Sequence, residues 1–358
     1  MKNKGVVIST CSPEDETRGS VLRMHVLLNS LKKNNDKWVF CPSFFKSETI
    51  FIDGINIKYF PLTIFDICRA VILFFKGYPI SNIIFQRSHI LKELYSSDEA
   101  IFHLSRTFQF SKVKNKVTID LCESLGDNYR LRADLLPTFS LKKILFNYEA
   151  KRLSKFEESL AKNAAIETLF ISSNDSLIPI AKNYSILPNS ILSVPPKKTS
   201  NVINERKIVF IGQVDYEPNF YSIINTSKML NEIDAKYELH VIGSLSSQNR
   251  KILSGFSNIF LHGFVDNLED VITDALCGVA LIDNGTGMQN KVLDYFFYGI
   301  PALVSKNVYS GFPKESPSLI IDDIEDLKLK LIDCCDIENR INLQDQGYTF
   351  LEKINQSY

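Results

Sequence analysis

The sequence of 358 residues contains no apolar run of 18 residues, so it predicts no membrane-spanning helix. Its seven cysteines are scattered, with neither a C-x-x-C pair nor a cysteine–histidine cluster at the spacing of a zinc site. This pattern is typical of free thiols in a reducing cytoplasm. The N-terminal residues MKNKGVVIST have no signal-peptide core and predict a first strand instead.

Net charge is zero over the whole chain but is divided unevenly between its halves. Residues 1–200 hold 28 basic and 19 acidic residues, a balance of +9, whereas residues 201–358 hold 13 and 22, a balance of −9. A basic half indicates a surface that meets an anionic partner. We find no nucleic-acid recognition motif and no compact block of basic and aromatic residues, so an anionic membrane surface or glycan is the better candidate.

Alternating apolar and amphipathic segments predict an α/β fold with mostly parallel sheets. The polar segment Pro195–Arg206 begins with two prolines and separates two such regions. We therefore expect two Rossmann-like βαβ domains, residues 1–198 and 206–339, that face each other across a cleft, followed by a helix over 340–358. The strands expected in the first domain are Gly5–Thr10, Trp38–Cys41, two within Ile50–Phe60, Ala100–Leu104, Lys116–Leu121, Glu167–Ser172 and Ile191–Val194, and the expected helices are Val21–Lys33, Ile64–Lys76, Leu141–Asn163 and Asp175–Asn183.

The stretch Leu281–Ser305, LIDNGTGMQNKVLDYFFYGIPALVS, carries the most informative pattern in the chain. It begins as the end of an apolar run that predicts a buried strand. The glycines that follow suit a loop whose backbone approaches a ligand, such as phosphate. A helix is expected from about Gln289, Gly299 ends it, and Ile300–Val304 predicts the next strand.

Two polar residues of this expected helix, Lys291 and Asp294, are the strongest candidates for chemistry. Lys291 lies in the first turn, where free backbone N–H groups and the helix dipole already favour an anion. A cation is out of place there unless a diphosphate binds. Asp294, one turn further, can accept hydrogen bonds from sugar hydroxyls. The alternative is a βα unit in which Lys291 and Asp294 form an ordinary surface pair.

The same stretch resembles the donor-site signature of family-4 retaining glycosyltransferases, and in particular a bacterial branch of group 1 sugar transferases with the motif G-[IT]-[QR]-N-K-V-L-E-A-M-A-x-G-x-P-V-V. Here it stands as GMQNKVLDYFFYGIPALV. Asp294 replaces the usual Glu, and Thr286 stands where the wider family has an earlier Glu. The resemblance implies a GT-B fold, with an acceptor-binding domain at 1–198, a nucleotide-sugar domain at 206–339 and a terminal helix, 340–358, that crosses back onto the first domain.

Two further segments of the second domain extend the resemblance. IVFIGQVDYEPNFYSI, from Ile208, is similar to F-x-G-x-M-D-Y-x-P-N-x-x-A. Gln213 stands where many relatives carry a basic residue that holds phosphate, which leaves Lys291 as the main cation. The segment HGFV resembles x-G-x-V, and the backbone of its Phe264 or Val265 would contact a uracil edge. For the Ile208 segment the alternative is a turn built for folding only, and the glycine of HGFV can equally be an ordinary turn at a strand end.

The first domain offers weaker candidates. DETRGSVLRMHVLL resembles K-G-D-K-I-R-S-Y-H-L-L, which would place Gly19 near the transferred sugar and Arg23 one turn into a helix. TIDLCESLGDNY resembles V-D-F-V-D-x-D-S-x-K-W and supplies Asp120 and Glu123, while His103 ends an earlier strand. The plainer alternatives are a surface salt bridge for the arginine, a loop carboxylate pair and a packed or capping imidazole.

The resemblance implies transfer of a sugar from a nucleotide-diphosphate sugar, with UDP preferred to GDP, to a glycan or lipid-linked acceptor of bacterial surface polysaccharide, with retention. The catalytic candidates are Lys291, Asp294, His103, Asp120 and Glu123. The donor-binding candidates are Gly19, Arg23, Gly212, Gln213, Asn219, Phe264, Val265, Gly287, Met288, Gln289, Asn290, Lys291 and Asp294.

We expect no metal, since no D-x-D motif is present, and no cofactor beyond the donor substrate. Lys291 and the helix N-terminus would stabilise the leaving diphosphate. The expected location is the cytoplasm, peripheral on the inner face of the cell membrane. Two alternatives stay open: a non-catalytic nucleotide-sugar-binding protein or subunit, and a nucleotide-sugar epimerase.

Overall fold

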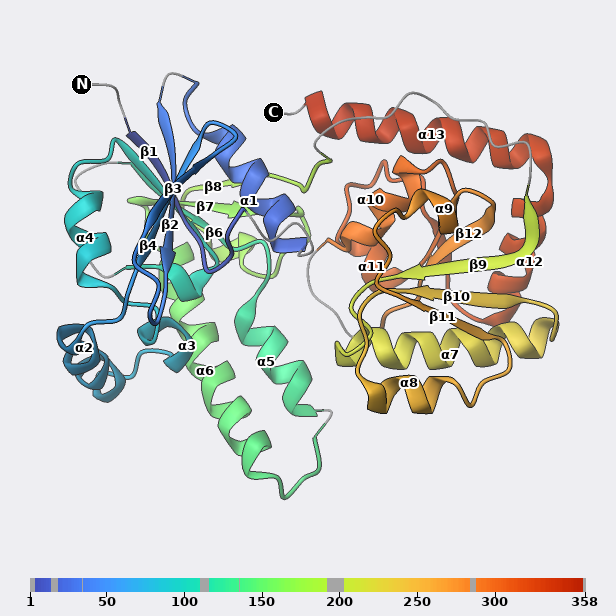
Figure 1. Ribbon diagram of the computed structural model, residues 1–358, viewed down its shortest axis with the longest axis horizontal. Coiled ribbons are helices and arrows are strands. Elements are labelled where there is room, and N and C mark those ends of the chain that lie inside the picture. Colours follow the sequence, from blue (N-terminus) through green and yellow to red (C-terminus); the bar gives the residue numbers. More distant parts are fainter. Residues whose placement is uncertain are drawn as a thin grey trace. The chain divides into compact units, whose positions relative to one another are not determined.

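The structure is a computed structural model that describes residues 4–13, 19–33, 35–109, 116–134, 136–191, 203–283 and 288–356 (Figure 1). The chain divides into two compact units, one up to Asn189 and one from Ser190. Each unit contains a mainly or wholly parallel sheet with helices, which confirms the predicted α/β fold class. Within the described residues, no helix combines the length and the apolarity needed to cross a membrane.

The described residues of the first unit form an eight-stranded sheet in the order β3-β4-β2-β1-β5-β6-β7-β8. Neighbouring strands are parallel except for the β3–β4 hairpin. Asp53 and Gly54 turn this hairpin with φ angles of 48° and 80°, the positive values of a type I′ turn. The strands are β1 (Lys4–Ile8), β2 (Asp36–Pro42), β3 (Thr49–Ile52), β4 (Ile55–Phe60), β5 (Glu99–His103), β6 (Lys116–Asp120), β7 (Ile166–Phe170) and β8 (Tyr184–Ile186).

Helices cover both faces of this sheet, which explains why consecutive residues of its central strands, such as Val6, Val7 and Ile8, are buried. Alternate residues of a strand point to opposite faces. Val6 of β1 packs in one cluster with Phe156 of α6, and Val7 packs in another with Met24 of α1. The helices are α1 (Gly19–Ser30), α2 (Ile64–Phe75), α3 (Ile80–Ile83), α4 (Ser88–Leu94), α5 (Leu125–Asp134) and α6 (Leu141–Ala161).

Two expectations for the first unit are wrong. Residues 175–183 form only a short 3-10 turn, Ile178–Ile180, because Pro179 would stand inside a longer helix without the N–H group that the helix needs there, and Ala181 then becomes extended. The last strand of the sheet is β8, not Ile191–Val194. Ile191 lies outside any strand, and the rest of that segment lies outside the described residues.

The second unit contains a six-stranded sheet in the order β11-β10-β9-β12-β13-β14, and every neighbouring pair is parallel. Parallel strands end at one edge, where such sheets bind ligands. The strands are β9 (Asn204–Ile211), β10 (Glu238–Ile242), β11 (Ile259–Gly263), β12 (Ala275–Ala280), β13 (Ala302–Ser305) and β14 (Leu319–Ile321). The helices are α7 (Glu217–Ile233), α8 (Ser247–Leu253), α9 (Glu269–Ile272), α10 (Asn290–Phe297), α11 (Lys306–Ser310), α12 (Ile324–Cys335) and α13 (Ile337–Gln356).

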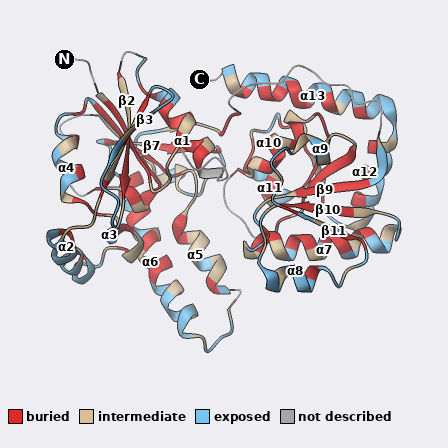
Figure 2. Cartoon of the chain, in the orientation of Figure 1, coloured by how far each residue is buried: buried red, intermediate tan, exposed pale blue. Residues whose placement is uncertain are grey.

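Buried residues concentrate in the sheets and on the inner faces of these helices (Figure 2). One cluster joins Ile208 and Phe210 of β9 to Leu230 of α7 and Leu331 of α12. The terminal helix α13 packs on α10 of the same unit, where the rings of Phe296 and Phe350 lie 5.8 Å apart. Its predicted crossing back to the first unit stays a prediction.

Candidate functional site

Three glycines lie at the carboxyl edge of the second sheet, after neighbouring strands. Gly212, Gly243 and Gly263 follow or end β9, β10 and β11, with φ angles of 148°, 144° and 73°. The Gly212 N–H donates to Ile242 O (2.9 Å), and the Gly243 N–H donates to Gly263 O (2.8 Å). A Cβ on Gly243 would lie 1.9 Å from the carbonyl oxygen of Gly212. The backbone at this edge is therefore packed so closely that it admits no side chain at Gly243.

Helix α10 begins beside this edge. Its N-cap residue, Gln289, has an extended backbone and makes no side-chain capping bond. The first turn contains no acidic residue, although a carboxylate is favourable there. The helix is strongly amphipathic, with Val292, Leu293 and Phe296 buried, and this apolar face fixes which way its first turn points.

Lys291, in that first turn, is held by contacts from two other elements. Its Nζ donates to Asn219 Oδ1 of α7 (2.8 Å), and Asn219 Nδ2 donates to the carbonyl of Gln213 (2.9 Å). The ammonium group also lies 4.0 Å from the centre of the Phe210 ring. A Cβ on Gly212 would come within 3.3 Å of Nζ. Glycine at this strand end thus leaves room for the lysine, which is 7% exposed.

The electrostatics of Lys291 and Asp294 follow from burial. Burial lowers the pKa of the Lys291 ammonium group to about 7, and the nearby Asp294 opposes this shift. Burial raises the pKa of the Asp294 carboxyl group to about 6, and Lys291 opposes that shift. The Lys291 ammonium group is buried and donates its hydrogen bond to a neutral amide, so a bound anion would offset the cost of its burial.

Tyr295 anchors α10 to the sheet, a role that the sequence pattern does not predict. Its hydroxyl donates to Val279 O (2.9 Å) and accepts from the Ile211 N–H (3.2 Å), so it links β12 and β9. Its ring covers Gly278, where a Cβ would lie only 2.4 Å from ring atoms. A buried tyrosine placed over a strand glycine is visible in sequence only as one more apolar helix position.

The structure brings together several donor-binding candidates named from the sequence. Gly212, Gln213, Asn219 and Lys291 are linked by the contacts above. Of the remaining candidates of this unit, Met288 is buried, and Asn290, Asp294 and Val265 are half-buried. Phe264 is exposed and follows the end of β11. Gly287 lies outside the described residues.

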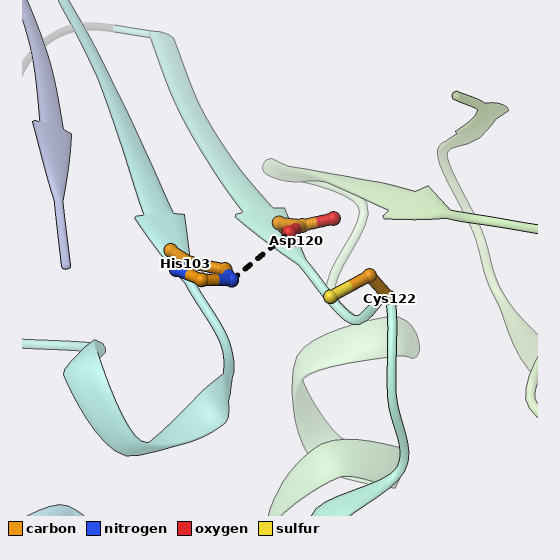
Figure 3. Close-up of side chains that lie close together, drawn as sticks. All are labelled: His103, Asp120 and Cys122. Atoms are coloured by element: carbon orange, nitrogen blue, oxygen red, sulfur yellow. Dashed lines mark ion pairs between the residues drawn. The ribbon is translucent and has the colours of Figure 1, made fainter. Parts of the chain in front are cut away.

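The candidates of the first unit other than Gly19, which begins α1, lie at or near the carboxyl ends of β5 and β6. His103 and Asp120 pair in register across these strands, and Cys122 follows, so that their polar atoms lie within 4.8 Å of one another (Figure 3). His103 Nδ1 is 3.1 Å from Ser9 Oγ, and its Nε2 is 4.0 Å from Asp120 Oδ2. Burial lowers the pKa of His103 to about 4, and Asp120 opposes that shift.

Arg23 forms an ion pair with the Asp120 carboxylate. Its Nε lies 3.1 Å and 3.2 Å from the two carboxylate oxygens, and Nη2 lies 2.5 Å from Oδ1. Nη1 donates to Leu187 O and Asn189 Oδ1. The arginine is 2% exposed, so its pairing is a buried ion pair and not the surface salt bridge of the simpler alternative. Its proposed contact with a donor stays a prediction.

This arrangement does not fit a metal ion, although three ligand-type residues meet. The guanidinium of Arg23 already supplies the positive charge beside Asp120, and a cation would be repelled by it. Burial also raises the pKa of the Cys122 thiol well above its ordinary value, which favours the thiol over the metal-binding thiolate. Glu123, the other predicted carboxylate, accepts a hydrogen bond from Asn128 Nδ2. The contacts of this cluster fix the ends of β5 and β6 and the loops that follow.

Glu157 of α6 is a residue that sequence reasoning missed. It accepts hydrogen bonds from Ser105 Oγ (2.7 Å), Ser124 Oγ (3.2 Å) and the N–H groups of Leu125 (3.1 Å) and Gly126 (3.3 Å). Glu157 therefore links the segment that follows β5 to the loop that follows β6 by hydrogen bonds. Burial raises its pKa to about 7 against these hydrogen bonds. The available signal was its position on α6, four residues after Leu153 and three before Leu160, which places Glu157 on the apolar face of the helix.

The backbone bends sharply just after His103. Leu104 has a φ angle of 68°, an unfavourable value for a residue with a branched side chain. Its N–H donates to Asp120 O (2.9 Å), which holds the bend in place. Backbone strain of this kind costs about 1–3 kcal/mol and is concentrated at functional sites. The end of β5 next to His103 is therefore a strained turn that this hydrogen bond stabilises.

Comparison with known proteins supports this picture. Residues 205–336 match the family model described as glycosyl transferases group 1. No curated protein matches the sequence. Among solved structures, the chain resembles trehalose-6-phosphate from E. coli bound with UDP-2-fluoro glucose, with a TM-score of 0.64, 12% identity and coverage of 99% of this chain and 96% of that chain.

Two more structures have a comparable similarity. A trehalose-6-phosphate synthase studied for enzymatic glycosyltransfer with retention has a TM-score of 0.62 and 13% identity, over 99% of this chain and 97% of that chain. A UDP-forming trehalose-phosphate synthase from Burkholderia xenovorans has a TM-score of 0.64 and 12% identity, over 99% and 96%. The second unit thus carries a region that matches group 1 glycosyl transferases, and the chain as a whole has the two-unit α/β fold of the GT-B glycosyltransferases.

Proposed function

We propose that this protein is a glycosyltransferase that moves a sugar from a nucleotide-diphosphate sugar, UDP in preference to GDP, to a glycan or lipid-linked acceptor of bacterial surface polysaccharide, with retention. The observation that carries the proposal is Lys291. It is a buried ammonium group at the start of α10, beside a glycine-lined sheet edge, inside the region that matches group 1 glycosyl transferases. Retention rests on the resemblance of the signature sequence and on the described neighbour.

Lys291 would act on the leaving group. When the bond between the sugar and the diphosphate breaks, negative charge grows on the diphosphate oxygen. The ammonium group and the N–H groups of the first turn of α10 are fixed in place before this happens, so no reorganisation is needed. Asn219 and Phe210 position Nζ without neutralising it, since one is an amide and the other a ring.

Asp294 would hold a hydroxyl group of the donor, and its substitution tests this. Asp294→Asn keeps the size of the side chain but removes the charge that strengthens an accepted hydrogen bond. We expect the affinity for the nucleotide-sugar to fall about tenfold. Calorimetry measures it, and Glu232→Gln, an exposed carboxylate on α7, is the matched control. Unchanged affinity in a folded Asp294→Asn protein would assign the residue to structure alone.

The pKa of Lys291 predicts how donor binding depends on pH. The free protein carries a charged Lys291 below about pH 7 and a neutral one above it. A diphosphate binds the charged form, and Asp294 is charged above about pH 6, so affinity should be highest between about pH 6 and 7. Above pH 7 it should fall by up to tenfold per unit, until the raised pKa of the complex is reached. A UDP-sugar is the suitable probe because its diphosphate does not titrate near neutrality.

The control for this profile is Lys291→Met, a neutral side chain of similar length. Its affinity should be low and should not fall as the pH rises above 7, because Asp294, whose pKa Lys291 no longer lowers, can only gain charge there. The same pKa has the opposite effect on stability. Above about pH 7 the unfolded chain binds a proton that the native lysine does not, so this residue's contribution to stability rises with pH and is least favourable below pH 7. A wild-type affinity that does not change across pH 7 would contradict the assignment.

The first unit would bind the acceptor, with His103 and Asp120 near it, and the protein would act in the cytoplasm at the inner face of the cell membrane. The basic balance of residues 1–200 motivates the membrane, since an anionic leaflet attracts basic surfaces. The donor would be a substrate, with no resident cofactor or metal in the reaction.

The decisive experiment measures release of nucleotide from a panel of UDP-sugars and GDP-sugars, with and without a membrane extract as acceptor source. A transferase releases the nucleotide much faster when acceptor is present. An epimerase instead changes the sugar without releasing nucleotide. A binding protein does neither, although calorimetry still detects the donor. The last two results would each reject the proposed function in favour of the corresponding alternative.

A further inference from the structure

Helix α2 in the first unit exposes apolar side chains and buries an acidic one. Its buried residues are Asp66 and Leu73. Asp66 accepts hydrogen bonds from the Thr63 N–H (3.1 Å), Thr63 Oγ1 (2.7 Å) and the Ser88 N–H (2.7 Å), which tie the start of the helix to the unit. The exposed apolar residues, with their exposed fractions, are Ile64 (81%), Phe65 (66%), Ile67 (50%), Val71 (53%), Ile72 (56%), Phe74 (36%) and Phe75 (82%).

A second apolar strip lies on the first turns of α6. Its members recur at positions that share one face of a helix. The loop before α6 adds Phe139, which is 98% exposed. The members are Leu141 (84%), Ile144 (63%), Leu145 (51%) and Tyr148 (42%). Figure 1 shows α5 and α6 projecting together beyond the sheet, and Figure 2 shows that α2 and the projecting part of α6 are largely exposed.

Arg152 joins the two strips. Its guanidinium lies 4.8 Å from the centre of the Phe74 ring of α2 and 4.3 Å from that of Tyr148 of α6, and Nη1 donates to Tyr78 O (3.0 Å). The apolar faces of α2 and α6 therefore meet at one arginine. We call residues 61–77 together with residues 136–152 the α2–α6 surface. An apolar surface of this extent on a folded unit marks an interaction site.

The charged side chains that the α2–α6 surface exposes are basic. Its only acidic residues are Asp66 and Glu149, and both are buried. Glu149 accepts hydrogen bonds from Ile80 N (2.9 Å), Ser81 N (2.7 Å) and Ser81 Oγ (2.7 Å), so its charge is directed inward. The basic residues of the surface are Arg69, Lys76, Lys142, Lys143, Lys151 and Arg152.

We infer that the α2–α6 surface docks on an anionic lipid bilayer, with its apolar side chains in the headgroup boundary and its lysines and arginines among the lipid phosphates. An amphipathic helix with exposed aromatic residues and flanking cations is the usual form of such a surface. The pairing of large apolar area with charge of one sign favours a bilayer over a second copy of the chain, whose identical surface would repel it. This inference deepens the proposed membrane association and rests on the proposed function only for the acceptor that the membrane would carry.

Vesicle sedimentation tests the inference with the full chain. The protein should pellet with phosphatidylglycerol vesicles at low salt, detach as salt rises, and stay in solution with phosphatidylcholine vesicles. The combined variant Phe65→Ser, Phe75→Ser, Phe139→Ser and Leu141→Ser should lower partitioning at least about tenfold. Because all four side chains are exposed, the melting temperature should be unchanged. The matched control is Leu329→Ser with Ile332→Ser, exposed apolar positions on α12.

The outcomes separate this inference from the proposed function. Loss of vesicle binding in the four-residue variant but not in the control, with calorimetric nucleotide-sugar affinity unchanged, supports it. Equal partitioning of the wild type and the four-residue variant would overturn it. It would also be overturned if the wild type ignored both kinds of vesicle and light scattering showed a dimer that the variant loses. In either of these cases, nucleotide release in the donor panel would still test the proposed function independently.

Discussion

Replacement of Lys291 by alanine is expected to lower kcat about 100-fold or more. The ammonium group lies at the start of α10 and is held by Asn219 and the Phe210 ring. Its contact with a diphosphate strengthens as the leaving group gains charge, so the loss should appear in kcat more than in KM. Steady-state nucleotide release with a saturating donor measures this directly.

Two companion variants make the result interpretable. Lys291→Met preserves most of the buried volume and should lose activity to a similar degree, which separates loss of charge from loss of packing. Lys228→Ala removes an exposed lysine from α7 of the same unit and should leave turnover unchanged. Both Lys291 variants should fold, because removing a buried charge relieves its desolvation cost. Near-normal kcat in either of them would show that the diphosphate is bound elsewhere.

Most of the strand and helix order could be predicted because the buried strands are continuous apolar runs with clear ends. The run before Gly212 and the run before Asp283 both became strands that end at the ligand edge of the second sheet. The failure at Asp175–Asn183 arose because Pro179 stands in the middle of the expected helix, where it lacks the N–H group that a helix needs. Local propensity could not show that the last strand of the sheet lies at Tyr184–Ile186.

The candidate donor site was predictable where function depends on residues close in sequence. Lys291 in the first turn of a helix after a glycine loop is such a case. Its partner Asn219 is 72 positions away, and the bond between them depends on how α7 and α10 meet at the sheet edge. The resemblance supplied both residues, but periodicity alone could not have paired them.

Arg23 and Glu157 show the limits of the sequence more sharply. Each is a charged residue on a helix, and such residues are mostly exposed. In the structure Arg23 is buried against Asp120, and Glu157 is buried beneath the loops after β5 and β6. Both depend on partners about 30 to 100 positions away, so only the folded chain reveals that they are interior groups.

Substitution of Gly243 by alanine should damage the second unit more than any single change on its surface. Its φ angle of 144° is one that residues with a side chain rarely adopt. The new Cβ would lie 1.9 Å from the Gly212 carbonyl oxygen, which is backbone and cannot rotate away. We expect a loss of at least about 3 kcal/mol, combining backbone strain with the displacement of β9 from β10.

Gly263→Ala is the matched control for this effect. Gly263 also has a positive φ angle, 73°, but a Cβ there would meet only the flexible end of Arg250 at 3.5 Å. That variant should lose about 1–2 kcal/mol, the cost of a left-handed conformation alone. Calorimetric unfolding separates the two: the second-unit transition should fall by on the order of 10 °C in Gly243→Ala and by a few degrees in Gly263→Ala.

The same substitution also tests whether the glycine edge serves the donor site. Gly212 adjoins both Asn219 and Lys291, so any shift of its carbonyl group moves the residues that position the ammonium group. Below its melting temperature, the Gly243→Ala protein should therefore bind a UDP-sugar at least about tenfold more weakly than the Gly263→Ala protein, since small displacements of a charged contact weaken it strongly. Wild-type affinity and wild-type stability in Gly243→Ala would show that the backbone at this edge can rearrange freely, and that the closeness of Gly212 and Gly243 has no role in placing Lys291.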